Sequence, residues 1–114
     1  MKEVRFSPTA EARLTDILEH SIKRWGLKRA EEYKKRLLQR ILSVALGELP
    51  HPRPCEALMH GQRDAAGLCY CREQSHYIVL RESDDRVEVV DFIHQSRDLE
   101  RLIDKLSGAR RDKR

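Results

Sequence analysis

The residues best suited to bind a metal in this chain are three cysteines and five histidines. Cys69 and Cys71 lie two residues apart, which places both thiols on one face of a strand. The other candidate ligands are Cys55, His51, His60 and His76. A structural zinc site usually takes four ligands from two closely spaced pairs, and the chain offers only one such pair. We therefore expect free thiols and no metal site. Because the five glycines are scattered, we expect no phosphate-binding loop and no cofactor.

The chain offers one histidine beside a hydroxyl, His94 and Ser96, as candidates for nucleophilic catalysis. Ser96 is more simply an N-cap, and no glycine-flanked nucleophile is present. The acidic residues Asp84, Asp85 and Glu88 fall on a turn and an outward strand face, where solvated charge is the usual explanation. The residues alone therefore predict no catalytic set.

Positive charge is concentrated in one stretch, residues 20–42, which has eight basic and two acidic residues. One interpretation is a solvated helix face, with Glu31 and Glu32 placed four residues before Lys35 and Arg36. The alternative is a surface for an acidic partner or a phosphate backbone. Trp25, the only tryptophan, is expected either in the core or as an anchor for a partner.

Length and composition set the class of protein. The chain has 114 residues, a net charge of +4, 39% apolar residues and 37% charged residues, which suits one domain with one core. No apolar run approaches the roughly 18 residues that a membrane helix needs. The charged N-terminus is unlike a signal peptide, and an odd cysteine count is typical of a reducing compartment. We expect a cytoplasmic protein without membrane association.

Two helices are predicted after a short N-terminal strand at residues 2–6. Ser7 is a suitable N-cap and Pro8 a suitable first helical residue, and Gly26 marks the end of the first helix. The second helix is predicted over residues 28–46, and the short connection predicts an antiparallel hairpin. Its predicted inward face consists of Ala30, Tyr33, Leu37, Leu38, Ile41, Leu42 and Ala45.

Three strands are predicted in the second half, over residues 67–72, 76–82 and 86–94, and their short turns predict an antiparallel meander. Ser96 is expected to cap a final helix that ends at Gly108. The fold class is α+β, a helical hairpin on a small, mainly antiparallel sheet, in the order βααβββα. We expect one domain over residues 1–107 and a basic, disordered tail over residues 108–114.

The order and spacing of several motifs resemble a known family. The N-terminal part contributes Ser7-Pro8-Thr9-Ala10, Ile17-Leu18, Trp25-Gly26, Ala30 and Tyr33. The C-terminal part contributes the strand from Val87 to His94, followed by Arg97-Asp98-Leu99. This pattern resembles the RelE/ParE superfamily of toxins from bacterial type II toxin–antitoxin systems, and its ParE branch most closely, over roughly residues 2–104.

The resemblance implies a toxin that inhibits DNA gyrase by binding, without an established catalytic residue, and that a ParD-like antitoxin silences in a hetero-oligomeric complex. The alternative is a RelE-like endonuclease that cleaves mRNA on the ribosome, for which Arg72, Arg81 and His94 are the candidate catalytic residues. A third alternative is a non-toxic remnant that binds only its antitoxin. Asp91 occupies a position that is commonly basic in both branches, and a carboxylate there would repel a scissile phosphate.

Two further sets of site residues follow from the resemblance. We expect the antitoxin to dock on an apolar groove along the hairpin and sheet, formed by Trp25, Tyr33, Leu37, Leu68 and Tyr70. Toxicity or target binding is expected to involve Arg97, Asp98 and Arg101.

Overall fold

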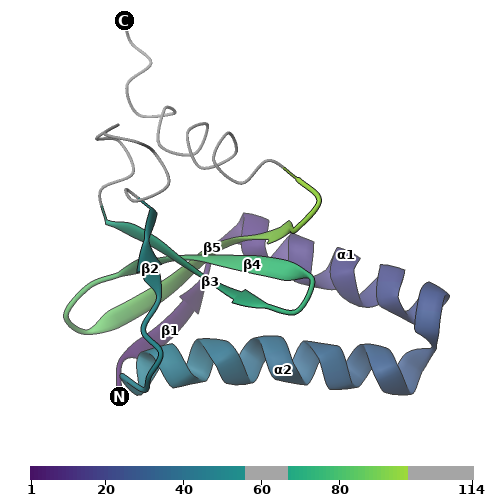
Figure 1. Cartoon of the computed structure of the whole chain (residues 1–114), viewed down its shortest axis with the longest axis horizontal. Helices are drawn as coiled ribbons and strands as arrows, with labels where there is room; N and C mark the ends of the chain where they lie inside the picture. Colours follow the sequence, from purple (N-terminus) through teal and green to yellow (C-terminus); the bar gives the residue numbers. More distant parts are fainter. Residues whose placement is uncertain (56–66, 98–114) are drawn as a thin grey trace, which may run out of the picture.

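The computed structural model describes residues 1–55 and 67–97. Its elements are β1 (Glu3–Phe6), α1 (Pro8–Trp25), α2 (Leu27–Ala45), β2 (Arg53–Pro54), β3 (Leu68–Glu73), β4 (His76–Glu82) and β5 (Arg86–His94). The strands form one sheet in the order β1-β5-β4-β3-β2, and the two helices form a hairpin that packs on one face of it (Figure 1). The α+β class, the hairpin and the meander of β3, β4 and β5 are confirmed. The short strand β2 is not among the predicted strands, and the predicted C-terminal helix and tail lie outside the described residues.

The start of α1 is fixed by Ser7, as predicted. Its Oγ accepts a hydrogen bond from the Ala10 N–H at 3.0 Å and donates one to the Val90 carbonyl at 2.7 Å. The helix ends before Gly26, whose φ of 93° is a conformation that a side chain would disfavour. Ser7 therefore both caps the helix and ties it to strand β5.

β1 lies beside β5 in parallel register, with Val4 opposite Val87, while the remaining pairs in the sheet are antiparallel. β5 contains a bulge, because Asp91 lies opposite Val79 and Val89 lies opposite Leu80. Val90 is thus the extra residue, and the alternation of faces changes there.

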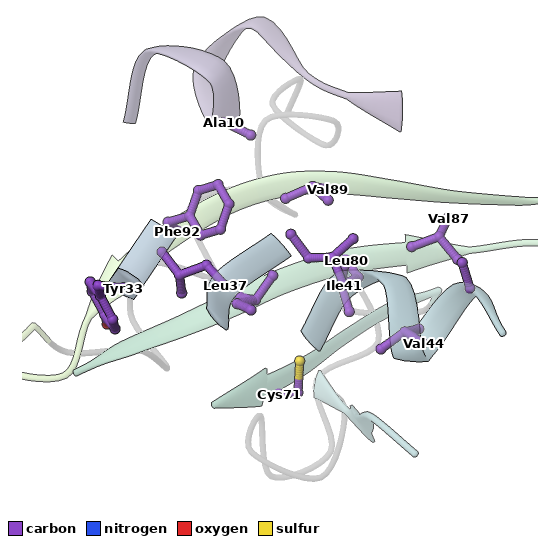
Figure 2. Packing of buried hydrophobic residues seen from close by; sticks show 12 residues of the cluster. Ala10, Tyr33, Leu37, Ile41, Val44, Cys71, Leu80, Val87, Val89 and Phe92 are labelled. Atoms are coloured by element: carbon purple, nitrogen blue, oxygen red, sulfur yellow. The ribbon is translucent and has the colours of Figure 1, made fainter. Parts of the chain in front are cut away.

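Two apolar clusters lie on the opposite faces of the sheet. The helix-side cluster joins both helices to the sheet through Leu37, Ile41, Ile78, Leu80, Val87, Val89 and Phe92, among others (Figure 2). The outer-face cluster contains Cys55, Leu68, Val79 and Ile93, with Tyr70, Tyr77 and Val90 packed against it. The bulge explains why Val89 and Phe92, three residues apart, share the helix side.

The predicted inward face of α2 is wrong at two positions. Ala30, Tyr33, Leu37, Ile41 and Ala45 are buried, but Leu38 is 36% exposed and Leu42 is 41% exposed. The reason is geometric: α2 rests on the sheet along a narrower stripe than the apolar pattern suggested, and its Val44 is buried there as well.

Candidate functional site

A cleft of about 890 Å³ opens between the helical hairpin and the β3–β4 turn, and we call it the histidine cleft. Helix α1 contributes Asp16, Ile17, His20, Ser21, Arg24 and Trp25, and α2 contributes Arg29, Glu32, Tyr33 and Arg36. Gln74, Ser75, His76 and His94 complete the lining from the sheet. Residues spaced four apart on α1, and three or four apart on α2, share a helix face, which is why both helices present several polar side chains here.

Tyr33 is the centre of the polar contacts in this cleft. Its hydroxyl lies 3.1 Å from the Glu73 carbonyl, 3.2 Å from the Ser75 nitrogen and 2.7 Å from His76 Nδ1. All three contacts are satisfied together if the hydroxyl donates to the carbonyl and accepts from the Ser75 N–H and from a hydrogen on Nδ1. Burial raises the pKa of Tyr33 above its ordinary value, which keeps the hydroxyl protonated.

Of the three histidines that line the cleft, His76 and His94 come from the sheet and differ in their hydrogen bonds. Burial, with smaller contributions from the nearby His94 and His20, lowers the pKa of His76 to about 4, so this ring is neutral at physiological pH. With its hydrogen on Nδ1, His76 has a free acceptor at Nε2. His94 Nδ1 accepts the Ser96 N–H at 3.0 Å, so a neutral His94 carries its hydrogen on Nε2. The rings meet edge to face at 5.1 Å.

Asp91 lies in a smaller pocket of about 150 Å³ that it shares with Arg13, His94 and Arg97. Its buried Oδ1 accepts hydrogen bonds from Arg13 Nε at 3.1 Å and from the Phe92 N–H at 2.8 Å. This carboxylate therefore lines the same pocket as His94, one of the candidate ribonuclease residues, and its negative charge would repel a phosphate group there.

The three candidate ribonuclease residues are not brought together. Arg72 lies over the Tyr77 ring and donates to the Gln74 carbonyl and to Gln95 Oε1, on the outer face of the sheet. Arg81 is 3.9 Å from Glu88, and four residues along β4 separate it from Tyr77, or about 13 Å. His94 lines the histidine cleft on the helix side.

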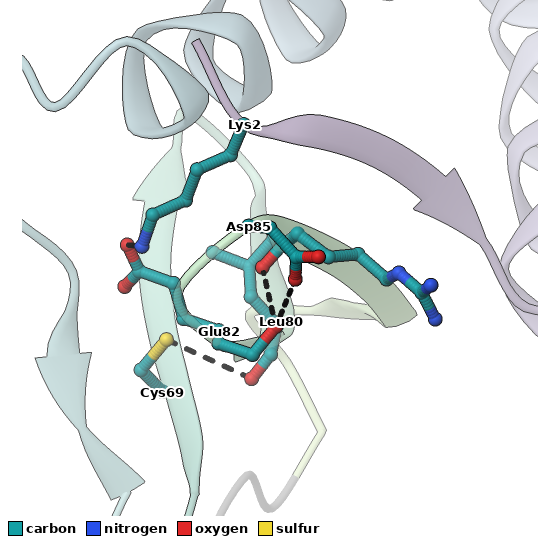
Figure 3. A network of polar contacts seen from close by, with 7 residues as sticks. Lys2, Cys69, Leu80, Glu82 and Asp85 are labelled. Atoms are coloured by element: carbon teal, nitrogen blue, oxygen red, sulfur yellow. Dashed lines mark hydrogen bonds and ion pairs between the residues drawn. The ribbon is translucent and has the colours of Figure 1, made fainter.

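The end of the sheet near Arg81 carries an ion pair and a tight turn, and its described residues lack the cluster of histidines found in the histidine cleft. Lys2 Nζ pairs with Glu82 at 2.9 Å, and the tight turn after β4 is closed by contacts of Ser83 with Asp85 and Arg86 (Figure 3). Burial raises the pKa of the adjacent Cys69 thiol to about 12, so it stays protonated. Exposed ion pairs and an unreactive thiol offer no catalytic group.

The five predicted antitoxin-binding residues do not form one surface. Trp25, 47% exposed, and Tyr33 both line the histidine cleft, whereas Leu37 is fully buried. Leu68 and Tyr70 belong to the outer-face cluster, on the other side of the sheet. Of the predicted toxicity residues, Arg97 lines the Asp91 pocket, and Asp98 and Arg101 lie outside the described residues.

An exposed apolar groove on the hairpin is a feature that the sequence prediction missed. We call it the leucine groove; its volume is about 430 Å³, and it is lined by Leu18, Glu31, Lys34, Lys35, Leu38, Gln39 and Leu42. The leucines had been assigned to the core because their spacing is the same as that of core residues. The one signal in the sequence that distinguishes these exposed leucines from core leucines is the pair of basic neighbours, Lys34 and Lys35.

Neither described helix has the length and apolar character needed to cross a membrane. Within residues 1–55 and 67–97, no three histidine, cysteine or acidic side chains gather closely enough to hold a metal ion.

Comparisons with known proteins point to one family. Residues 4–99 match the sequence profile of the family described as the ParE toxin of the type II toxin–antitoxin system parDE. Toxin ParE1 of Caulobacter vibrioides is 35% identical over 99 residues, covering 84% of this chain and 92% of the relative. Toxin ParE1 of Mycobacterium tuberculosis is 31% identical over 97 residues, covering 83% and 91%.

Solved structures share the fold at low sequence identity. A chain of the chromosomal ParDE system from P. aeruginosa matches with a TM-score of 0.64 and 12% identity, covering 82% of this chain and 96% of that one. A chain of the heterotetrameric YoeB–YefM toxin–antitoxin complex from Staphylococcus aureus matches with a TM-score of 0.54 and 14% identity, covering 82% and 97%.

Proposed function

This chain belongs to the ParE toxin family of type II toxin–antitoxin systems, and from that premise we propose that it arrests growth by binding DNA gyrase until a ParD-like antitoxin neutralises it. The family match across residues 4–99 carries the proposal. The proposed place of action is the cytoplasm, where the chain would meet gyrase and form a hetero-oligomer with its antitoxin.

The arrangement of charged residues favours a binding protein over a ribonuclease. RNA cleavage needs cationic groups around one scissile phosphate, where they stabilise the charge that develops. Here Arg72 and Arg81 lie far apart on the outer face, and Asp91 lies beside His94. Binding to a protein target does not require cationic groups to be gathered around one phosphate.

The proposed antitoxin site is the leucine groove. An amphipathic helix would place its apolar side on Leu38 and Leu42 and its acidic side chains near Lys34 and Lys35. Leu38 and Leu42 are exposed, and within residues 1–55 and 67–97 neither Lys34 nor Lys35 forms an ion pair. This groove replaces Leu37, Leu68 and Tyr70 as the proposed contact.

The proposed gyrase contact includes Arg97. It lies three residues after the end of β5, and its backbone N–H donates to the His94 carbonyl at 2.9 Å, which fixes the Arg97 backbone at the end of this strand. Arg97 lines the Asp91 pocket together with Arg13.

A supercoiling assay with purified gyrase tests this function. We expect the purified chain to inhibit supercoiling, and equimolar antitoxin to restore it. Arg97→Gln should weaken inhibition by about tenfold, the effect of one lost charge-assisted contact. Arg86→Gln, an equal loss of charge at the exposed start of β5, is the matched control and should have little effect. Full gyrase activity at saturating folded toxin would refute the proposal.

A further inference from the structure

The histidine cleft has the size and chemistry of a ligand site that the proposed toxin function does not use. Its volume of about 890 Å³ falls within the range of small-molecule sites, 300–1,000 Å³, and exceeds what a bare phosphate ion would fill. Both helices and two strand ends line it, so a ligand would be held by rigid elements.

One buried hydroxyl in this cleft has no hydrogen-bond partner among the described residues. Ser21 is 3% exposed and lines the cleft, and no hydrogen bond of its side chain is found among the described residues. A buried polar group without a partner costs roughly 1–3 kcal/mol. Its position in a cleft lining means that a bound ligand can satisfy it.

Three guanidinium groups surround the same space. Arg24, Arg29 and Arg36 all line the cleft, and none forms an ion pair within the part of the chain that the structure describes. Guanidinium groups bind phosphate oxygens through paired N–H donors. The stretch from Lys23 to Arg29 has four basic and no acidic residues, which adds to the positive potential at the cleft mouth.

The other side chains fit the remaining parts of a nucleotide. Trp25 is about half exposed, with the Arg24 guanidinium 5.7 Å from its ring centroid, and it offers a surface on which a planar base can stack. Asp16 and Glu32 are carboxylates within reach of the cleft, and such groups accept hydrogen bonds from ribose hydroxyls.

We propose that the histidine cleft binds a free nucleotide, with its phosphates on Arg29 and Arg36 and its base against Trp25. The two carboxylates, Asp16 and Glu32, offset only part of the positive charge of the three arginines. The cleft therefore favours a ligand that carries both anionic groups and hydrogen-bond donors. This site is separate from the leucine groove on the other side of α2, and so the proposal stands or falls independently of the antitoxin contact.

Fluorescence of the single tryptophan tests the proposal directly in the purified full chain. The probe is ATP without added metal, and calorimetry on the same samples reports binding that leaves the fluorescence unchanged. We expect saturable quenching by ATP, and about tenfold weaker binding for Arg29→Gln and for Arg36→Gln. Arg86→Gln, on β5 and outside the lining of the cleft, carries the same charge change and should stay within about twofold.

Three probes define the outcomes that would overturn the assignment. Tripolyphosphate binding as tightly as ATP would show a general anion site, and adenosine binding as tightly would show that the arginines do not matter. A single-stranded oligonucleotide that binds much more tightly than ATP would assign the cleft to a polymer. Absence of binding by both fluorescence and calorimetry at millimolar ATP would also overturn it.

Discussion

Leu37 and Leu38 are consecutive residues of α2 that lie on different sides of the helix. Leu37 is fully buried against the sheet in the helix-side cluster (Figure 2). Leu38 is 36% exposed and lines the leucine groove. The buried side stabilises the fold, and we assign the exposed side to partner binding. Hydrophobic periodicity cannot separate the two sides, because a core leucine and a docking leucine follow the same spacing.

The largest expected effect is a difference in stability between variants of Leu37 and Leu38. Leu37→Ala should lower the free energy of unfolding by about 2–5 kcal/mol, since it leaves a cavity in a close-packed cluster. Leu38→Ala should cost less than about 1 kcal/mol, because its side chain is already partly in water. Urea unfolding measures both, and equal losses would contradict the comparison.

For antitoxin binding, we expect the exposed side of α2 to matter more than the buried side. The double variant Leu38→Gln, Leu42→Gln should weaken the antitoxin complex by about tenfold to a hundredfold while the chain stays folded, because two apolar contacts are lost. Titration calorimetry with the cognate antitoxin checks this. Leu49→Gln, an exposed leucine outside the groove, is the control, and an equal effect there would place the antitoxin elsewhere.

Tyr33 tests whether the buried side of α2 also depends on a polar contact. Tyr33→Phe keeps the ring but leaves the Ser75 N–H and His76 without their partner. The expected loss is about 1–2 kcal/mol in the free energy of unfolding, smaller than for Leu37→Ala. An unchanged stability would show that the hydroxyl contacts contribute nothing.

The smallest effect is a dependence of stability on pH. The pKa of His76 is about 4 in the folded chain and near 6.5 when unfolded, so the unfolded chain takes up this proton first as the pH falls. Stability from this group is present above pH 6.5 and is lost between about pH 6.5 and 4. The neighbouring His94 and His20, and the hydroxyl of Tyr33, face the same ring.

We expect a loss of about 1 kcal/mol across that window, after allowing for solvent access. His76→Gln, which removes the titrating group and keeps a side chain able to bond to Tyr33, should flatten the profile. A profile of equal slope in this variant would assign the pH dependence to other groups.

Local signals in the sequence predicted most of the fold. The cap at Ser7, the end of α1 before Gly26 and the bounds of β4 and β5 depend on residues close together in the chain, and the structure confirms them. The bulge at Val90 was not predicted, because it depends on how β4 and the start of α1 meet β5 in space.

The candidate site was less predictable than the fold. Tyr33 meets His76 across 43 positions and Arg13 meets Asp91 across 78, and no local pattern indicates either contact. The five residues predicted to form one antitoxin-binding groove lie on different faces of the sheet for a related reason. Residue types indicated apolar surface, but the face of the sheet on which Leu68 lies is set by strand register.

The most direct test of a gyrase-binding toxin is to induce this chain alone in a bacterial host and follow thymidine and methionine incorporation over the first minutes. The proposed function predicts that DNA synthesis stops first, and that coexpressed antitoxin prevents the arrest. Protein synthesis stopping first would contradict it in favour of mRNA cleavage. Unchanged synthesis of both while folded protein accumulates would contradict toxicity itself.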